Sequence, residues 1–130
     1  MVPKFRCFDK FTKTMHEVVA IDFKDRSVYY ESYGLRNYWS KNVVLMQSTG
    51  LYDNNGVEIF EGDIVEHLDF NSNEITKSEV RILKGCFYLV ISVDGFKYDV
   101  PMMDLKDDEC ILQIKGNVHE NHELLEVSDE

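Results

Sequence analysis

The sequence lacks most of the features that would identify an activity at once. It contains no phosphate loop, no G-x-G-x-x-G, no G-x-S-x-G and no internal repeat. Its three cysteines, Cys7, Cys86 and Cys110, form no C-x-x-C pair, so neither a zinc knuckle nor a disulfide framework is indicated. Each cysteine stands among apolar or aromatic neighbours, and we expect all three to be small buried hydrophobic side chains. No cofactor is expected.

Proline and long apolar runs are also scarce. Two prolines, set against eight Phe, seven Tyr and many β-branched residues, favour strands over a helical bundle. No run approaches the roughly 18–20 apolar residues of a membrane span, and residues 1–6 lack the apolar core of a signal peptide. We therefore expect a cytoplasmic protein. The 44% of hydrophobic residues suffices for a core and argues against disorder.

The net charge of −10 is distributed unevenly along the chain. Residues 1–48 carry 8 basic and 5 acidic side chains, a net charge of +3. Residues 49–103 carry 4 and 10, and residues 104–130 carry 2 and 9, which gives −6 and −7. An acidic body is repelled by phosphate backbones, which disfavours ordinary DNA or RNA binding. The same charge suits docking on a basic surface of a partner protein.

Alternation of apolar and polar residues predicts a mainly β protein of one domain, residues 1–130. Residues 1–48 should form an antiparallel β-meander, with Val19, Ile21 and Phe23 on one face of its second strand. Residues 49–119 should form a small barrel-like β core, in which 71–77 is a polar loop and the near-continuously apolar stretch 86–93 is the most buried strand. Residues 120–130 should hold a short helix, capped by Asn121, and a tail.

Two glycine-containing turns lie at the centre of the chain. The first, with Asp53, Asn55 and Gly56, is typical of a tight turn in which Gly56 takes a left-handed conformation. Its Asp53 can accept a hydrogen bond from the backbone N–H two residues on. The second is formed by Glu61, Gly62 and Asp63, where glycine permits a sharp reversal and the carboxylate can bind free backbone N–H groups. Both predict structural roles.

The acidic residues of these turns could also form a metal-binding or acid–base site. The EF-hand pattern fails, because placing Gly56 at its sixth position puts Leu51 first and Gly62 twelfth. Glu58, Glu61 and Asp63 would need a pocket that shifts their pKa values before they could act as acid and base. The pair His119 and His122 lacks both the i, i+4 spacing of a helical zinc site and a third ligand. We assign no catalytic or metal-binding residue.

Three groups of residues together resemble the YopX family of phage and prophage proteins. They are Lys4-Phe5-Arg6, Asp9 and Met15 at the start, Leu45-Met46-Gln47, Thr49-Gly50-Leu51, Asp53, Asn55-Gly56 and 58–65 in the centre, and Gly116-Asn117-Val118-His119-Glu120-Asn121 with Leu124-Leu125 at the end. Two departures are His122, where proline is common, and Phe60, where tyrosine is common. The resemblance implies a mostly β fold with an SH3-like barrel element. It implies no established activity, and no catalytic residue can be carried over.

The remaining candidate residues concern partners. Tyr38 and Trp39 stand among basic residues, and Asp107, Asp108 and Glu109 form an acidic run. We expect these residues to form the surface of a non-enzymatic protein-interaction module, which binds another protein or its own copies. One alternative is a nucleic-acid-associated protein that uses the basic N-terminal third, or an acidic mimic of nucleic acid. The other is a metal-dependent enzyme.

Overall fold

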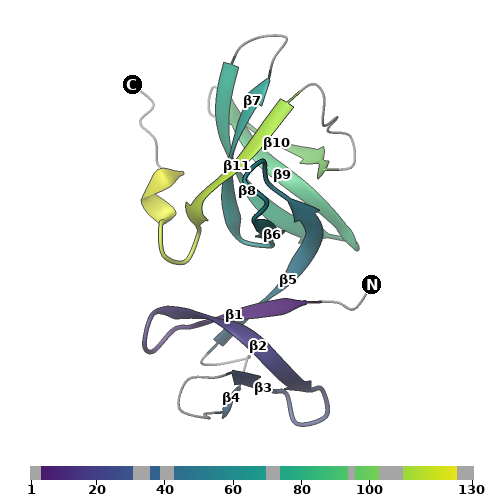
Figure 1. Ribbon diagram of the computed structural model, residues 1–130, viewed down its shortest axis with the longest axis vertical. Coiled ribbons are helices and arrows are strands. Elements are labelled where there is room, and N and C mark those ends of the chain that lie inside the picture. The colour runs from purple at the N-terminus through teal and green to yellow at the C-terminus, as the bar shows by residue number, and fades with distance from the viewer. Residues whose placement is uncertain are drawn as a thin grey trace. The chain divides into compact units, whose positions relative to one another are not determined.

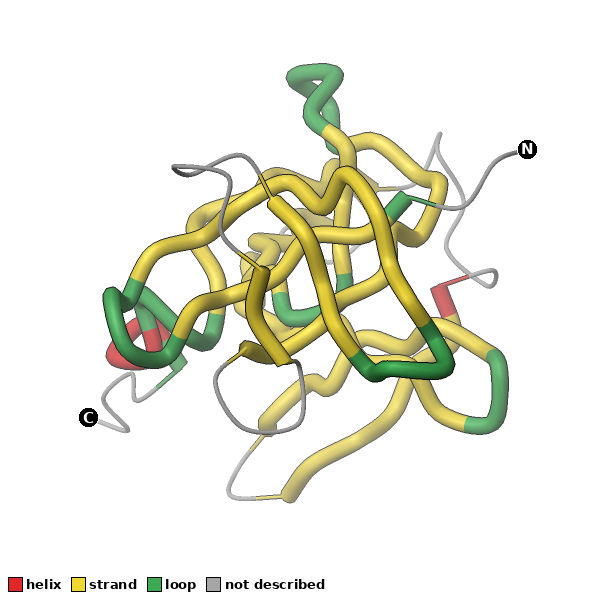
Figure 2. The backbone as a smooth tube through the Cα atoms, turned by 90° about the horizontal axis from the view of Figure 1, so that it is seen from below, coloured by secondary structure: helices red, strands yellow, loops and turns green. Residues whose placement is uncertain are grey.

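The chain is mainly β. In the computed structural model the described residues are 4–30, 36–38, 43–69, 74–93, 96–102 and 110–125. Figure 2 shows these residues as strands joined by short turns, and helical residues are confined to 3₁₀ turns at Met102 and at His122–Leu124. No helix of the described part is long and apolar enough to cross a membrane. The chain divides into two compact units, residues 1–48 and 49–130.

The first unit is the expected antiparallel meander, joined by the beginning of a fifth strand. Its strands lie in the order β4-β3-β2-β1-β5 (Figure 1), and each is antiparallel to its neighbours. Strand β5 begins in this unit and ends in the second. The bounds are β1 Phe5–Asp9, β2 Thr14–Asp22, β3 Ser27–Tyr30, β4 Arg36–Tyr38 and β5 Val43–Tyr52.

A small core holds the first unit together. Its buried members come from three strands, and Val18 and Leu45 pack against them. The predicted face of Val19, Ile21 and Phe23 is wrong, because Val19 and Phe23 are exposed. Pairing between β2 and β3 shifts register between Val18 and Ala20, so the side chains after the shift no longer follow the simple alternation. The buried members are Cys7, Val28, Tyr30 and Val43.

The second unit is built on a five-stranded antiparallel sheet in the order β10-β9-β8-β7-β11. Consecutive strands β7 to β10 are neighbours, and β11 returns beside β7. Strand β6 lies next to the end of β5. Among the described strands this order is open, and they form no closed barrel. The bounds are β6 Glu58–Phe60, β7 Asp63–Asp69, β8 Glu74–Leu83, β9 Cys86–Val93, β10 Phe96–Pro101 and β11 Cys110–Asn117.

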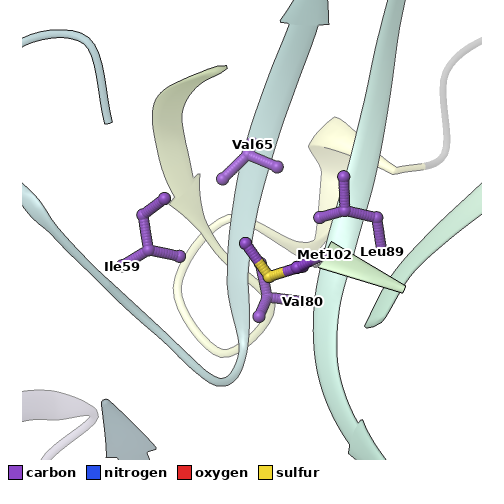
Figure 3. Close-up of a cluster of buried hydrophobic side chains, with 5 residues drawn as sticks. All are labelled: Ile59, Val65, Val80, Leu89 and Met102. Carbon is purple, nitrogen blue, oxygen red and sulfur yellow. The ribbon is translucent and has the colours of Figure 1, made fainter. Parts of the chain in front are cut away.

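The core of the second unit takes one buried side chain from each of four strands and one from the residue after β10. Figure 3 shows its five buried side chains, which come from β6, β7, β8, β9 and the residue after β10. Phe87, Ile91, Leu112 and Ile114 pack around them. Because the strands alternate, each contributes only every second side chain to this cluster. The five are Ile59, Val65, Val80, Leu89 and Met102.

Two sequence-based expectations for this unit are wrong. The polar stretch 71–77 is not all loop, since β8 begins at Glu74 and pairs with β7 from there on. Polar residues suit a strand that has one solvated face, so composition alone placed the boundary too late. Strand β9 is not the most buried one, because Leu89 is its only fully buried residue among those whose side chains are described, whereas β7 begins with three buried residues. Because side chains alternate along a strand, every second described side chain of β9 points away from the core.

Candidate functional site

Asp53 organises the central turn and ties it to a distant strand. Its Oδ1 accepts the N–H groups of Asn55 and Val57, both at 2.9 Å, so the predicted bond to the residue two positions on is confirmed. Its Oδ2 accepts the N–H of Ile114 in β11 at 3.0 Å. Gly56 has the expected left-handed φ of 81°. The side chain of Asp53 is buried, and its two carboxylate oxygens accept backbone N–H groups from its own turn and from β11.

This environment keeps Asp53 ionised. Burial alone would raise its pKa, but the N–H groups of Ile114, Val57 and Asn55 favour the charged form and lower the pKa below its ordinary value. A second backbone bond, from Asn54 N–H to the Leu112 carbonyl at 2.9 Å, places the turn along the outer side of β11. The carboxylate is thus a structural acceptor. A buried acid saturated with backbone donors is poorly suited to exchange protons with a substrate.

The corner Glu61-Gly62-Asp63 has the predicted structural character. Gly62 has a φ of 89°, and the Asp63 Oδ2 accepts the Phe60 N–H at 2.8 Å. Gly62 also bonds at 2.8 Å through its N–H to the Val80 carbonyl and through its carbonyl to the Val118 N–H. This backbone therefore joins the start of β7 to β8 and to the turn after β11.

The third motif, residues 116–121, forms a turn that is closed by side chains. The Asn117 Oδ1 accepts the N–H groups of His119 and Glu120 at 3.0 and 2.9 Å, and its Nδ2 donates to Glu120 Oε1 at 2.7 Å. Asn121 occupies the predicted N-cap position, and its backbone carbonyl accepts the Leu124 N–H at 2.9 Å. Its side chain accepts the Asn117 N–H at 3.2 Å and makes no capping bond to the 3₁₀ turn, so the side-chain cap is wrong. A Cβ on Gly116 would lie 2.5 Å from the Asn121 Oδ1, which explains the glycine.

The proposed acid–base and metal residues are not drawn into one site. Glu58 and Glu61 are half-buried, and Asp63 is buried with its carboxylate bound to backbone. His119 is half-buried in the 116–121 turn, and His122 is exposed at the start of the 3₁₀ turn. Among the described residues, no three His, Cys, Asp or Glu side chains come together in a group that could hold a metal ion.

Another buried carboxylate, Asp9, lies in the first unit. That it would bind several hydrogen-bond donors was not predicted from the sequence. Its Oδ1 accepts the N–H groups of Phe11 and Thr12, and its Oδ2 accepts the Tyr30 hydroxyl at 2.6 Å. Burial would raise the pKa of Asp9, but these donors, the Tyr30 hydroxyl first, lower it. An aspartate at a strand end, followed by donors two and three residues on, was the available signal.

Tyr30 and Cys7, the neighbours of Asp9, have raised pKa values, and His16 packs on Tyr30. The His16 ring stacks on Tyr30 with centroids 4.1 Å apart, and its Nε2 lies 2.6 Å from the Thr14 hydroxyl. Burial, followed by the hydrogen bond and charge of Asp9, raises the pKa of Tyr30. Burial and then the charge of Asp9 raise the pKa of Cys7 to about 12, so its thiol is protonated and unreactive at neutral pH.

The three cysteines have different outcomes. Cys7 is buried as expected, but Cys86 is exposed, and the prediction is wrong there. Cys86 follows the Lys84-Gly85 turn at the start of β9, where strand ends lie outside the core. The side chain of Cys110 lies outside the described part. So do Trp39, Asp107, Asp108 and Glu109, together with the side chain of Tyr38 at the end of β4.

Comparison with known proteins agrees with this architecture. Protein EF1440 from Enterococcus faecalis has a crystal structure that matches with a TM-score of 0.63 and 28% identity, over 96% of this chain and 99% of that one. YopX from Bacillus subtilis matches with a TM-score of 0.66 and 16% identity, over 93% and 96%, which shows a shared fold. Curated proteins gave no match. The family model described as "YopX protein" matches residues 4–126, and the chain therefore belongs to the YopX family.

Proposed function

We propose that this protein is a phage- or prophage-encoded, non-enzymatic protein-interaction module of the bacterial cytoplasm. The observation that carries the proposal is the use of the two carboxylates in the central motif. Asp53 and Asp63 are buried and accept backbone N–H groups, so their charge holds turns together. What is left for a partner is the surface, which combines a net charge of −10 with large exposed apolar side chains.

The proposed partner surface is the one expected from the sequence, Tyr38 and Trp39 with the acidic run Asp107, Asp108 and Glu109. Aromatic anchors are enriched among the residues that dominate protein-binding surfaces, and a run of like charges can attract a partner surface of the opposite charge. The partner would be a host or phage protein with a basic surface.

The test is quantitative pull-down from host cells with the full chain as bait. Trp39→Ala and Asp108→Lys should each reduce recovery of a specific partner several-fold. Glu17→Lys is the matched control, because it reverses one exposed acidic charge in β2 and should leave recovery unchanged. If Trp39→Ala and Asp108→Lys recover as much partner as Glu17→Lys does, the proposed surface is contradicted.

One observation favours a second candidate, a nucleic-acid-associated role for the first unit. Each of its two described turns carries an exposed phenylalanine beside exposed cations. Phe11, 90% exposed, lies between Lys10 and Lys13, and Phe23, 72% exposed, precedes Lys24 and Arg26. Exposed rings beside cations can stack on bases and contact phosphates. Salt-dependent binding of single-stranded DNA or RNA that weakens in Phe11→Ala supports this role, and no binding at low salt contradicts it.

The finer fold assignment also remains a proposal: we propose a partly open SH3-like barrel for the second unit. It is supported by the meander β7 to β10, by the 3₁₀ residue Met102 after it, and by the return of β11 beside β7. Backbone NMR contacts in solution test it. Further strand pairing that closes the sheet between β10 and β11 would contradict the partly open form.

A further inference from the structure

The two edges of the five-stranded sheet are treated differently. At β11 the turn around Asp53 covers the edge, since Asn54 donates to the Leu112 carbonyl and Ile114 donates to the Asp53 carboxylate. At β10, the last strand on the other side, no described strand pairs with the outer edge. An uncovered edge presents backbone N–H and C=O groups to any chain that can pair with them.

Strand β10 is also exposed along most of its length. Phe96, Lys97, Tyr98 and Asp99 are all exposed, with Phe96 at 66% and Tyr98 at 53%. Phe96 and Tyr98 share a face by alternation, and Tyr98 pairs with Ile91, which packs against the core. These two rings thus extend the apolar face of the sheet onto its last strand, β10. Lys97 and Asp99 lie on the opposite face.

The hairpin geometry decides which backbone groups point outward. Strands β9 and β10 are joined by two residues, with Val93 opposite Phe96. In such a hairpin the pair that flanks the loop is hydrogen-bonded, and bonded pairs then alternate along the strands. Phe96 and Tyr98 therefore direct their backbone groups toward β9. Lys97 and Asp99 direct theirs away from the sheet, while Pro101 has no N–H to offer at the end of the edge.

We propose that β10 pairs with β10 of a second copy of this chain, antiparallel and with a two-fold axis at Tyr98. In that register Lys97 lies opposite Asp99 of the second copy, and Asp99 lies opposite its Lys97. Both pairs use outward-facing backbone groups, as a bonded ladder requires. On the other face Tyr98 meets its own copy, and Phe96 meets Val100 of the second copy. A two-fold contact of this kind is self-complementary.

The charges select this register over its neighbours. A two-fold axis at Lys97 would place two lysines opposite each other, and an axis at Asp99 would place two aspartates opposite each other. A parallel, in-register pairing would do both. Like charges directly opposite each other destabilise paired strands, whereas opposite charges stabilise them. The self-complementary order Lys97-Tyr98-Asp99 is the argument that the occupant of this edge is a second copy rather than an unrelated strand.

This proposal deepens the interaction role by naming one partner, the chain itself, and it uses residues of β10, none of which belongs to the set Tyr38, Trp39 and 107–109. The two can therefore fail independently. Loss of a heterologous partner in the pull-down would leave self-association unchanged, and the reverse also holds.

The experiment is sedimentation equilibrium on the full chain at about 0.15 M salt, where a Debye length of about 8 Å screens much of the repulsion between two acidic chains. Lys97→Asp and Asp99→Lys should each weaken dimerisation by about tenfold, because each replaces two opposite-charge pairs by two like-charge pairs. Lys10→Asp, which makes the same charge change as Lys97→Asp in an exposed turn of the first unit, should have little effect.

Two rescues make the test specific to this register. The double variant Lys97→Asp/Asp99→Lys restores both opposite-charge pairs and should dimerise like the wild type. An equimolar mixture of the two single variants should form a heterodimer, because each acid of one chain then faces a lysine of the other. A wild-type chain that is monomeric up to about 1 mM, or a dimer that ignores both single variants, overturns the proposal. Failure of both rescues overturns the register.

Discussion

In each unit of the molecule a buried aspartate binds two N–H groups of its own turn and one distant donor, and Asp9 and Asp53 differ in that distant donor. Asp9 binds two N–H groups of its own turn and the Tyr30 hydroxyl, 21 residues away. Asp53 also binds two N–H groups of its own turn, but its distant partner is the backbone of Ile114, 61 residues away. The distant bond of Asp9 depends on another side chain, that of Tyr30. The distant bond of Asp53 depends only on the position of the β11 backbone.

Asp22, which is half-buried, shows the same turn without full burial and without a distant donor among the described residues. Its Oδ1 accepts the N–H groups of Lys24 and Asp25, both at 3.1 Å, and both bonds are exposed. Local turn chemistry is therefore common to all three aspartates. Burial and a distant donor distinguish Asp9 and Asp53, and they should account for most of the difference in stability.

The largest effect is expected for Asp53→Ala. Three backbone donors lose their acceptor, one of them on β11, and we expect a loss of about 3–5 kcal/mol in the free energy of unfolding. Urea denaturation measures the loss, and amide exchange should accelerate at Ile114. Asn54→Ala is the neighbouring control, since its exposed residue contributes a backbone bond that alanine retains. Equal losses in the two variants would contradict the role of the carboxylate.

A smaller loss, about 2–3 kcal/mol, is expected for Asp9→Ala, because one of its three donors is a hydroxyl that can rotate toward another acceptor. Asp22→Ala, which removes only the exposed turn bonds, should cost less than about 1 kcal/mol. Thermal unfolding of the two variants separates these cases. If Asp22→Ala costs as much as Asp9→Ala, burial and Tyr30 are not what distinguishes the turns.

Gly116→Ala tests the close approach of Gly116 to the Asn121 side chain. The new Cβ would meet the Asn121 side chain at 2.5 Å, so Asn121 must move and lose its bond to the Asn117 N–H. We expect a loss of about 1–2 kcal/mol. Adding Asn121→Ala should then cost less than it does in the wild type, a non-additivity that denaturation curves of the four proteins would reveal. Strict additivity would argue against the clash.

The smallest effect, and the one that sharpens the comparison most, concerns pH. The pKa values of Asp9 and Asp53 are lowered in the folded chain from an ordinary 3.8, so the unfolded chain takes up protons first as the pH falls. Their stabilisation is present above pH 3.8 and is lost below it. Tyr30→Phe should cost about 1 kcal/mol at pH 7.

Tyr30→Phe should also reduce the acid sensitivity, because it removes a donor that lowers the pKa of Asp9. Denaturation at pH 7 and pH 3 should show a smaller difference in this variant than in the wild type. The pH dependence that comes from Asp53 has no equivalent side chain to remove and should persist. An unchanged pH dependence in Tyr30→Phe would mean that the backbone donors alone set the pKa of Asp9.

Much of the local structure could be predicted from the sequence. The strands of the meander, the left-handed Gly56, the hydrogen bond inside the Asp53 turn and the corner at Gly62 all follow from residues within a few positions of each other. Errors arose where a neighbouring strand decided the outcome. The register shift after Val18 exposed Val19, and pairing with β7 turned the polar residues after Glu74 into strand.

The candidate site was predictable only in part, for the same reason. Asp53 was identified as a turn residue, but no pattern in the sequence indicates that its second oxygen binds Ile114. In the sequence, Asp9 stands out only as one of the residues that resemble the family. Its partner Tyr30 could have faced either side of β3. Long-range partners depend on strand order and register, which local propensities do not determine.

The sequence by itself therefore determined the mainly β class, the turns at Asp53 and Gly62, and membership of the YopX family. Turn chemistry and strand alternation act over two to five residues, and the same few residues carry the motif. The tertiary structure alone decided which carboxylates are buried and which edge of the five-stranded sheet is covered. The covered edge and the environment of Asp53 depend on β11 returning beside β7, because that return places Asp53 next to a strand 61 residues away. The environment of Asp9 depends on Tyr30 in β3.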